Sequence, residues 1–296
     1  MITLRSKAEV RAYVARARGA GRSVALVPTM GAFHAGHHAL MRAAREMCDE
    51  VIVSLFVNPA QFEEASDLAA YPRTEPHDAA EAAELGVDVL FAPPVEEIYP
   101  PGFATSVRVD GLGEILEGAE RGRGHFAGVC TVVSKLFNVV APDVAFFGQK
   151  DAQQVAVLRR MTTDLDLPVR IEVVPTVREP DGLALSSRNV RLDAGERERA
   201  LALSQALAAA RDAIDAGERD AQRIRAAALG AMAPHGVSAE YLALVDPDSF
   251  LPVDAVNGRV LVAVAARVGD TRLIDNALIP TVATPLAGAS TTTKER

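Results

Sequence analysis

The stretch that decides the fold runs from Val24 to Leu40 and reads V-A-L-V-P-T-M-G-A-F-H-A-G-H-H-A-L. Residues 24–27 are apolar and include the β-branched Val24 and Val27, which predicts a central strand covered on both faces. Gly31 and Gly36 follow, where the chain can bend sharply and a ligand can approach its backbone. Alanine and leucine then recur at helical spacing over residues 38–48. The stretch is therefore expected to form a strand, a loop and the start of a helix.

Two histidines, His34 and His37, flank Gly36 in an H-x-G-H spacing within this loop. A helix that begins near His37 presents unpaired N–H groups and the positive end of its dipole, which favour an anion. Imidazoles can also donate hydrogen bonds to phosphate oxygens, and they do so more strongly when they are cationic. A histidine-rich surface turn, or a zinc site that includes His38, is the alternative. The segment alone favours phosphate binding without excluding either alternative.

A second apolar run, residues 51–57, follows the helix and completes a β-α-β order. That order requires parallel strands joined by a right-handed crossover. Asn58 and Gln61 come directly after this strand, and ligands bind at the carboxyl ends of strands in open α/β sheets. Their amides both donate and accept hydrogen bonds, which suits the hydroxyls and carboxylate of a small acid. A simple turn capped by Gln61 accounts for them equally well at this point.

The loop G-Q-K-D follows another predicted strand, residues 144–147, and leads into a helix. Gly148 lets a ligand approach the backbone, and Lys150 can neutralise phosphate charge. Asp151 is expected to cap the helix while it accepts a hydrogen bond from a ribose hydroxyl. Gln154 lies one turn further along the same face. A solvated helix start is the alternative interpretation of the charged residues.

Two more segments are candidates for phosphate binding. Residues 117–128, E-G-A-E-R-G-R-G-H-F-A-G, are expected to form a flexible basic loop in which Arg121, Arg123 and His125 can close over polyphosphate. An exposed loop without a ligand competes with this interpretation. Residues 185–189, L-S-S-R-N, are short and polar, and composition alone predicts only a helix-capping loop.

Composition excludes several classes of protein. The chain has 296 residues, a formal net charge of −8 and no run of Lys or Arg, which argues against a nucleic-acid partner. We find neither a signal-peptide core at the N-terminus nor a run of membrane-spanning length, so we expect a cytoplasmic protein without a membrane partner. Cys48 and Cys130 lie in apolar contexts and are expected to be reduced core residues.

The pattern predicts an α/β chain with two domains. Residues 1–180 are expected to form a Rossmann-like parallel sheet that binds nucleotide, with an edge strand at residues 104–109. Residues 181–280 are expected to form a smaller α+β domain that closes the site. This domain would contain two alanine-rich helices followed by three strands. Residues 281–296 are rich in Ala, Thr and Ser and are expected to be disordered.

The loop P-T-M-G-A-F-H-A-G-H resembles the HxGH signature of nucleotidyltransferases that transfer AMP from ATP. Together with L-F-V-N-P-A-Q-F, Y-P-R-T, F-F-G-Q-K-D-A-Q-Q, L-A-L-S-S-R-N and R-L-I-D-N, it is similar to the pantothenate synthetase family from near residue 2 to near residue 280. Ordered matches over such a span are more specific than one motif. The resemblance implies an ATP-dependent ligase that joins pantoate to β-alanine through an enzyme-bound pantoyl adenylate, with release of AMP and pyrophosphate.

The resemblance also implies roles for individual residues. The catalytic groups would be His34, His37, Lys150 and Arg188. Pantoate would bind Gln61 and Gln154, with Asn58 beside them, and Gln61 would also contact β-alanine. ATP would bind residues from the loops described above, namely Met30, Gly31, Ala32, Phe33, His34, Ala35, Gly36, His37, Gly148, Gln149, Lys150, Asp151, Val177, Leu185, Ser186, Ser187 and Arg188.

In the implied reaction a carboxylate attacks the α-phosphorus of ATP, and the four catalytic groups with Mg²⁺ offset the repulsion between the two anions. Mg²⁺ is expected on the phosphates rather than on direct protein ligands, and the resemblance implies a homodimer. The family reads R-P-G-H-F where this chain reads R-G-R-G-H-F, so either Arg121 or Arg123 could take the usual place. An adenylyltransferase for a phosphorylated acceptor and a non-catalytic nucleotide-binding module are the alternatives.

Overall fold

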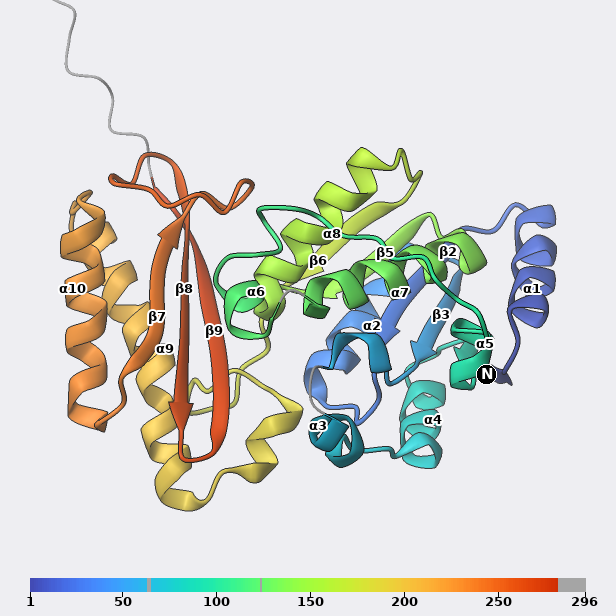
Figure 1. Cartoon of the computed structure of the whole chain (residues 1–296), viewed down its shortest axis with the longest axis horizontal. Coiled ribbons are helices and arrows are strands. Elements are labelled where there is room, and N and C mark those ends of the chain that lie inside the picture. Colours follow the sequence, from blue (N-terminus) through green and yellow to red (C-terminus); the bar gives the residue numbers. More distant parts are fainter. Residues whose placement is uncertain (63–64, 123, 282–296) are drawn as a thin grey trace, which may run out of the picture.

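The computed structural model describes residues 1–62, 65–122 and 124–281 and contains two β-sheets (Figure 1). Residues 281–296 were expected to be disordered. Apart from Thr281, they lie outside the residues that the structure describes. Within the described part of the chain, no helix is long and apolar enough to cross a membrane.

The first sheet has six strands, all parallel to their neighbours, in the order β1-β4-β3-β2-β5-β6. The prediction of a Rossmann-like parallel sheet is confirmed. The chain reverses its direction of winding between β2 and β5, and in such sheets ligands bind at the carboxyl ends of the strands at this point. The strands are β1 (Ile2–Leu4), β2 (Val24–Thr29), β3 (Glu50–Leu55), β4 (Val89–Phe91), β5 (Val144–Gly148) and β6 (Arg170–Val174).

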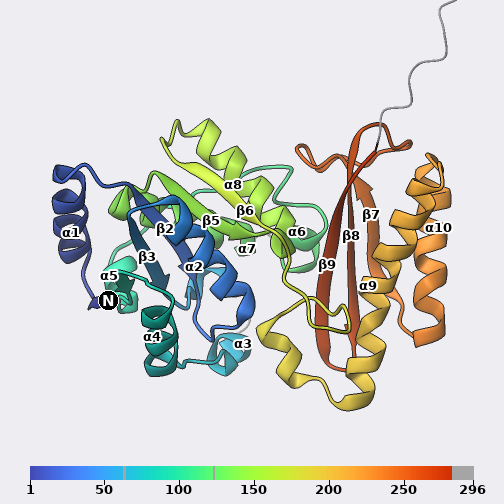
Figure 2. The ribbon, with the colours of Figure 1, turned by 180° about the vertical axis from the view of Figure 1, so that it is seen from behind.

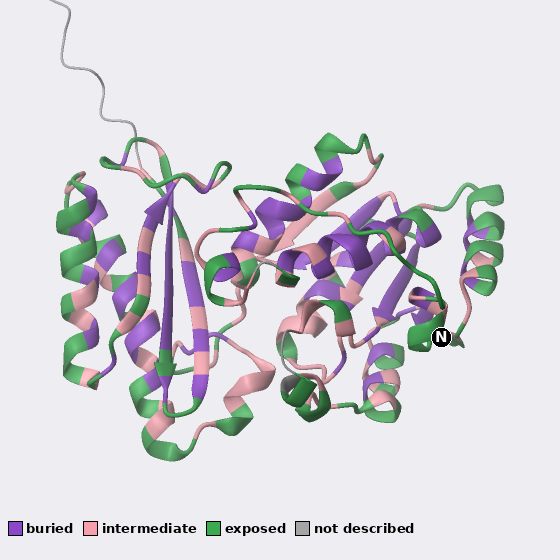
Figure 3. Cartoon of the chain, viewed as in Figure 1, coloured by how far each residue is buried: buried purple, intermediate pink, exposed green. Residues whose placement is uncertain are grey.

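Helices cover both faces of this sheet, so its central strands are buried (Figure 3). One face packs against α1 (Lys7–Gly19), α7 (Gly124–Val140) and α8 (Ala152–Asp164). The other face packs against α2 (Ala35–Met47) and α4 (Glu75–Glu84). Shorter helical segments connect these elements: α3 (Ala65–Ala70), α5 (Val95–Ile98), α6 (Glu117–Glu120), η1 (Pro59–Gln61), η2 (Gln149–Asp151) and η3 (Ser187–Arg191). Cys48 and Cys130 are both free and buried, as expected.

The second sheet is antiparallel, in the order β7-β8-β9, and lies beside the first domain (Figures 1 and 2). Its strands are β7 (Ala239–Val245), β8 (Arg259–Val268) and β9 (Thr271–Pro280). They bury a core of their own against α9 (Ala194–Asp215) and α10 (Ala221–Met232), with η4 (Ala233–His235) after α10. The predicted α+β character of this part is confirmed.

Two local predictions were wrong. Residues 104–109 form no strand, because this segment runs along α7 instead, where the backbone N–H of Val107 donates to Oγ1 of Thr131 over 2.9 Å. Residues 117–122 and 124–128, which the structure describes, do not form one loop, since they include α6 and the beginning of α7. Glycine serves close packing here: a Cβ at Gly118 would lie 2.0 Å from the carbonyl oxygen of Gly113.

Candidate active site

A cavity of about 660 Å³ lies between the carboxyl ends of the parallel strands and the antiparallel sheet. The loops after β2, β3, β5 and β6 line one side, and residues of β9 line the other. The residues predicted to bind substrates therefore lie around one cavity, with the exception of a few loop residues. Those that line it are Met30, His34, Gly36, His37, Asn58, Gln61, Gly148, Lys150, Asp151, Gln154, Val177, Leu185, Ser186, Ser187 and Arg188.

The two histidines of the loop lie side by side at the start of α2, with ring centroids 4.2 Å apart. His34 is the N-cap, and its Nδ1 accepts a hydrogen bond from the N–H of Gly36 over 3.1 Å. A neutral imidazole that accepts at Nδ1 carries its proton at Nε2. His37 packs against Phe33, and its buried Nδ1 has no hydrogen-bond partner in the described part of the chain.

The surroundings of both rings favour the neutral form. Burial lowers the pKa of His34, and burial together with the neighbouring His34 lowers the pKa of His37 to about 3. The stronger hydrogen bonds of cationic imidazoles are therefore not favoured in the free site. Neutral imidazoles can still donate one N–H each to an anion.

An aspartate from α4 fixes the backbone of the loop. Asp78 is 1% exposed, and its carboxylate accepts hydrogen bonds from the N–H groups of Ala32 (3.1 Å) and Phe33 (2.9 Å). Ala32 adopts a left-handed conformation with φ of 52°, which is strained for a residue with a side chain. Gly31, Ala32, Phe33 and Ala35, which were predicted to bind ATP, do not line the cavity. Their contact with ATP stays a prediction.

The amide side chains gather on the opposite side of the cavity. Gln61, Gln154 and Asn58 all line it, and Asn58 is 1% exposed. The Nδ2 of Asn58 donates to Oε1 of Gln61 (3.0 Å) and to the carbonyl of Gly128 (3.1 Å), and its Oδ1 accepts from the hydroxyl of Tyr99 (2.8 Å). These bonds occupy the amide of Asn58 and fix the position of Gln61. Direct binding of substrate by Asn58 stays a prediction.

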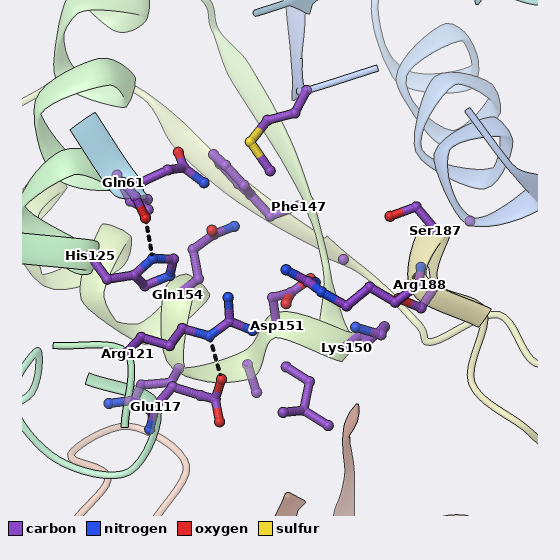
Figure 4. A pocket seen from close by; sticks show the side chains of 18 of the residues that line it. Gln61, Glu117, Arg121, His125, Phe147, Lys150, Asp151, Gln154, Ser187 and Arg188 are labelled. Carbon is purple, nitrogen blue, oxygen red and sulfur yellow. Dashed lines mark hydrogen bonds and ion pairs between the residues drawn. The ribbon is translucent and has the colours of Figure 1, made fainter. Parts of the chain in front are cut away.

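His125 and Gly128 on α7 hold the turn that carries Gln61. The ring of His125 donates from Nδ1 to the carbonyl of Gln61 over 3.0 Å (Figure 4). Burial, with the charge of Arg121, lowers the pKa of His125 to about 4, so the ring is neutral. At Gly128 the backbone of α7 lies so close to η1 that a Cβ would be 2.2 Å from the carbonyl oxygen of Ala60.

Replacing Gly128 by alanine is therefore expected to displace η1 and the Gln61 side chain. Overpacking of this kind costs about 1–3 kcal/mol, and we expect the KM for the substrate that Gln61 contacts to rise about tenfold, with a smaller change in the KM for a nucleotide. Gly124, at the start of the same helix, has open space where a methyl group would be added and provides the matched control. An unchanged KM for that substrate in Gly128→Ala would contradict this role of the contact.

The loop after β5 is held from the C-terminal domain. Nδ2 of Asn276 on β9 donates to the carbonyls of Gln149 (3.0 Å) and Lys150 (2.9 Å), and Nε2 of Gln149 donates back to Oδ1 of Asn276 (2.9 Å). Gln149 is consequently occupied outside the cavity, while Lys150 and Asp151 line it. Asp151 makes no side-chain capping bond, contrary to the prediction, because the 3-10 turn η2 precedes α8.

Residues 185–188 line the cavity on the side of Lys150. The N–H of Leu185 donates to the carbonyl of Val177 over 3.0 Å, which joins two predicted ATP segments. Ser186 caps η3 by accepting a hydrogen bond from the N–H of Arg188 over 3.2 Å. Figure 4 shows Ser187 and Arg188 on the Lys150 side of the cavity and Gln61 with Gln154 on the other.

A buried carboxylate that sequence reasoning missed joins the two domains. Glu117 of α6 is 5% exposed and accepts from both terminal nitrogens of Arg272 (2.8 and 2.7 Å), from Nε of Arg121 (2.7 Å) and from the hydroxyl of Tyr241 (2.9 Å). Arg272 also donates from Nε to Glu240 (2.6 Å). The only available signal was an arginine at the start of R-L-I-D-N, a segment otherwise typical of a strand.

The structure shows no preformed cluster of metal ligands among the residues that it describes. Over residues 1–62, 65–122 and 124–281, no three His, Cys, Asp or Glu side chains are placed to hold a metal ion together. The Asp151 carboxylate faces the cavity beside Lys150 (Figure 4), and carboxylate and phosphate oxygens are the donors that Mg²⁺ prefers. The site therefore suits a magnesium ion carried mainly by the phosphates of a nucleotide.

Comparison with known proteins identifies the family. The family model of pantoate-beta-alanine ligase matches residues 2–278. The chain belongs to this family. It is 53% identical to the pantothenate synthetase of Moorella thermoacetica and 49% identical to that of Pelotomaculum thermopropionicum, in each case over 94% of this chain and 99% of the relative.

Solved structures of pantoate-beta-alanine ligases agree with the fold. The pantothenate synthetase of Thermus thermophilus superimposes with a TM-score of 0.89 at 46% identity, over 94% of this chain and 99% of that one. The pantoate-beta-alanine ligase of Francisella tularensis, complexed with beta-gamma ATP and beta-alanine, gives 0.75 at 33% identity, over 94% and 97%. The resemblance inferred from the sequence motifs is confirmed.

Proposed function

We propose that the protein condenses pantoate with β-alanine to form pantothenate, using ATP, through an enzyme-bound pantoyl adenylate. The observation that carries this proposal is the composition of one cavity. Its HxGH loop and the Lys150 and Arg188 side chains suit a triphosphate, and the amides of Gln61 and Gln154 across from them suit a small hydroxy acid.

In the first step, a carboxylate oxygen of pantoate attacks the α-phosphorus, a bond to that phosphorus forms, and the bond to pyrophosphate breaks. The two reactants are anions that repel each other. Lys150 and Arg188 supply positive charge, and His34 and His37 supply neutral N–H donors. Mg²⁺, when bound to the phosphates near Asp151, supplies further charge neutralisation. Removal of one preorganised donor of this kind typically slows the reaction by about 100-fold or more.

In the second step, the neutral amine of β-alanine attacks the acyl carbon of the adenylate. The new C–N bond forms as the acyl–oxygen bond to AMP breaks, and the proton that the nitrogen loses passes to the phosphate of the departing AMP. Water would hydrolyse the mixed anhydride, so the site must exclude it. The neutral His37, with its pKa of about 3, supports electrostatic stabilisation of the first step rather than proton donation to pyrophosphate.

The organisation of the chain belongs to the same proposal. Residues 1–180 bind ATP and pantoate, and residues 181–280 close over them. The second hydrophobic core, which begins at Leu183, supports this boundary. Residues 185–188 act as a mobile phosphate-binding loop. We also propose a cytoplasmic homodimer, for which gel filtration of the purified chain is the test.

Pantoate-dependent exchange of labelled pyrophosphate into ATP tests the first step directly. We expect exchange with ATP, Mg²⁺ and pantoate in the absence of β-alanine. Mass spectrometry of the products after addition of β-alanine should then show pantothenate and AMP. Exchange that does not require pantoate, or that requires a phosphorylated acceptor instead, would overturn the proposal in favour of another adenylyltransferase. Nucleotide binding without turnover would indicate a non-catalytic module.

A further inference from the structure

The guanidinium of Arg121 stands at the cavity wall between Glu117 and Gln154 (Figure 4). Resting on the proposed function, we propose that Arg121 binds the carboxylate of β-alanine and so selects an amino acid as the second substrate. The residue lies on the amide side of the cavity rather than on the Lys150 and Arg188 side.

The hydrogen bonds of Arg121 leave it available for a ligand. Only its Nε is used, in the 2.7 Å bond to Oε2 of Glu117. Its two terminal NH₂ groups have no protein partner within residues 1–62, 65–122 and 124–281. They form the flat double donor that fits a carboxylate. Glu117 holds the guanidinium in place while Arg272 neutralises the same carboxylate from the other domain.

Three of the four other arginines that line the cavity, a set that also includes Arg191, differ in this respect. Arg272 donates from all three nitrogens, to Glu117 and Glu240. Arg188 lies with Ser187 and Lys150 on the side suited to phosphates (Figure 4). Arg267 is 58% exposed at the side chain and faces Glu240 across 3.8 Å. The Arg121 side chain is 27% exposed, so it is partly buried and still has free donors. Partial burial strengthens a hydrogen bond between its charged guanidinium and a carboxylate.

The chemistry of the two acids decides which of them Arg121 serves. The carboxylate of pantoate is the nucleophile of the first step, and a paired guanidinium would draw its electrons away from the α-phosphorus. The pantoate carboxylate then loses its negative charge when it becomes the acyl group of the adenylate. The carboxylate of β-alanine, in contrast, stays anionic from binding through to the product. It therefore needs a cation that is present throughout, two methylene groups from the attacking nitrogen.

The test compares nucleophiles with and without a carboxylate in Arg121→Gln. The adenylate is formed from ATP, Mg²⁺ and pantoate and is then consumed either by β-alanine or by hydroxylamine, which yields a hydroxamate and needs no cation. We expect kcat/KM for β-alanine to fall about 100-fold, chiefly through KM. Hydroxamate formation and pantoate-dependent pyrophosphate exchange should stay within about twofold of the wild type, because neither uses this group.

Two further variants control the experiment. Arg121→Lys keeps a positive charge without the double donor and should recover about tenfold of the lost β-alanine activity. Arg267→Gln removes an arginine from the same cavity away from the amides, and its ratio of β-alanine to hydroxylamine activity should match the wild type. Thermal unfolding of each variant monitors folding.

Several results would overturn the assignment. Equal losses with β-alanine and hydroxylamine in Arg121→Gln, or in Arg121→Lys if the glutamine variant does not fold, would assign Arg121 to the fold or to the adenylate. A rise in the pantoate KM for exchange would assign it to the first substrate. Absence of pantoate-dependent exchange in the wild type is a separate outcome, since it rejects the proposed function itself.

Discussion

Replacement of His37 by alanine is expected to slow pantoate-dependent pyrophosphate exchange by about 100-fold or more, which is typical for the loss of one preorganised donor. His37 lines the cavity at the start of α2, and burial together with His34 lowers its pKa to about 3. The ring is therefore a neutral donor. We expect His37→Gln, whose amide can place an N–H near the position of Nε2, to recover about tenfold of the lost rate.

The pH dependence separates this role from proton donation. A neutral donor with a pKa of about 3 contributes no titration between about pH 6 and 8, so the ratio of wild-type to His37→Gln rates should be constant over that interval. A general acid would instead make glutamine as damaging as alanine. It would also give a wild-type rate that falls with rising pH through the pKa of the ring.

His38 provides the matched control. It is the next residue of the same helix, but its Nε2 meets Glu81 at 3.2 Å and it does not line the cavity. We expect the exchange rate of His38→Gln to stay within about twofold of the wild type. A comparable loss in both variants would show that the measurement reports the stability of α2 and not the chemistry of the site.

The sequence predicted those parts of the fold that depend on local pattern. The apolar runs of β2, β3 and β5 and the loops after them were recognisable, because a buried parallel strand is a short continuous apolar segment. β1 was missed because Ile2–Leu4 is only three residues long and is defined by its pairing with β4. The strand expected at 104–109 failed because weak alternation also occurs in an extended segment packed on a helix.

The candidate site was predictable where a motif carries its own geometry. The HxGH loop, Lys150 and the two glutamines were named from their positions after strands, and they line one cavity. The occupied amide of Asn58 and the links from Asn276 and Glu117 were not predictable. They depend on contacts across the domains, as between Glu117 and Arg272, which are separated by 155 residues. No local pattern encodes such a pairing.

Replacement of Glu117 by alanine is expected to lower the free energy of unfolding by about 3–5 kcal/mol, the usual cost of breaking a buried ion pair on one side. Arg272 is 16% exposed at the side chain and would keep its charge without its bidentate partner. Tyr241 would lose the acceptor of its hydroxyl. Because the pair spans the two domains, we also expect a rise in the KM for ATP. Chemical denaturation at neutral pH measures the first effect.

A double substitution distinguishes the loss of the pair from the loss of packing. In Glu117→Ala, the guanidinium of Arg272 stays buried without its bidentate partner. Glu117→Ala combined with Arg272→Met removes that guanidinium as well, so the double variant should be more stable than Glu117→Ala alone. Asp110→Asn is the control for an exposed pair, because Arg108 and Asp110 are each 71% exposed at the side chain. Its effect should stay within about 0.5 kcal/mol. Strict additivity of the two single losses would contradict a coupled pair.

Acid should remove the contribution of Glu117 over a defined interval. Burial raises the pKa of this carboxyl, but the hydrogen bonds and charges of Arg272 and Arg121 outweigh it and lower the pKa from 4.5 to about 2. A pKa that is lower in the folded state stabilises the protein fully above the unfolded value and not below the folded one. The difference corresponds to about 3 kcal/mol. The stability gap between the wild type and Glu117→Gln should therefore be largest at neutral pH and shrink as the pH falls from 4.5 towards 2. A gap of the same size at pH 7 and at about pH 3 would mean that shape, and not charge, makes Glu117 important.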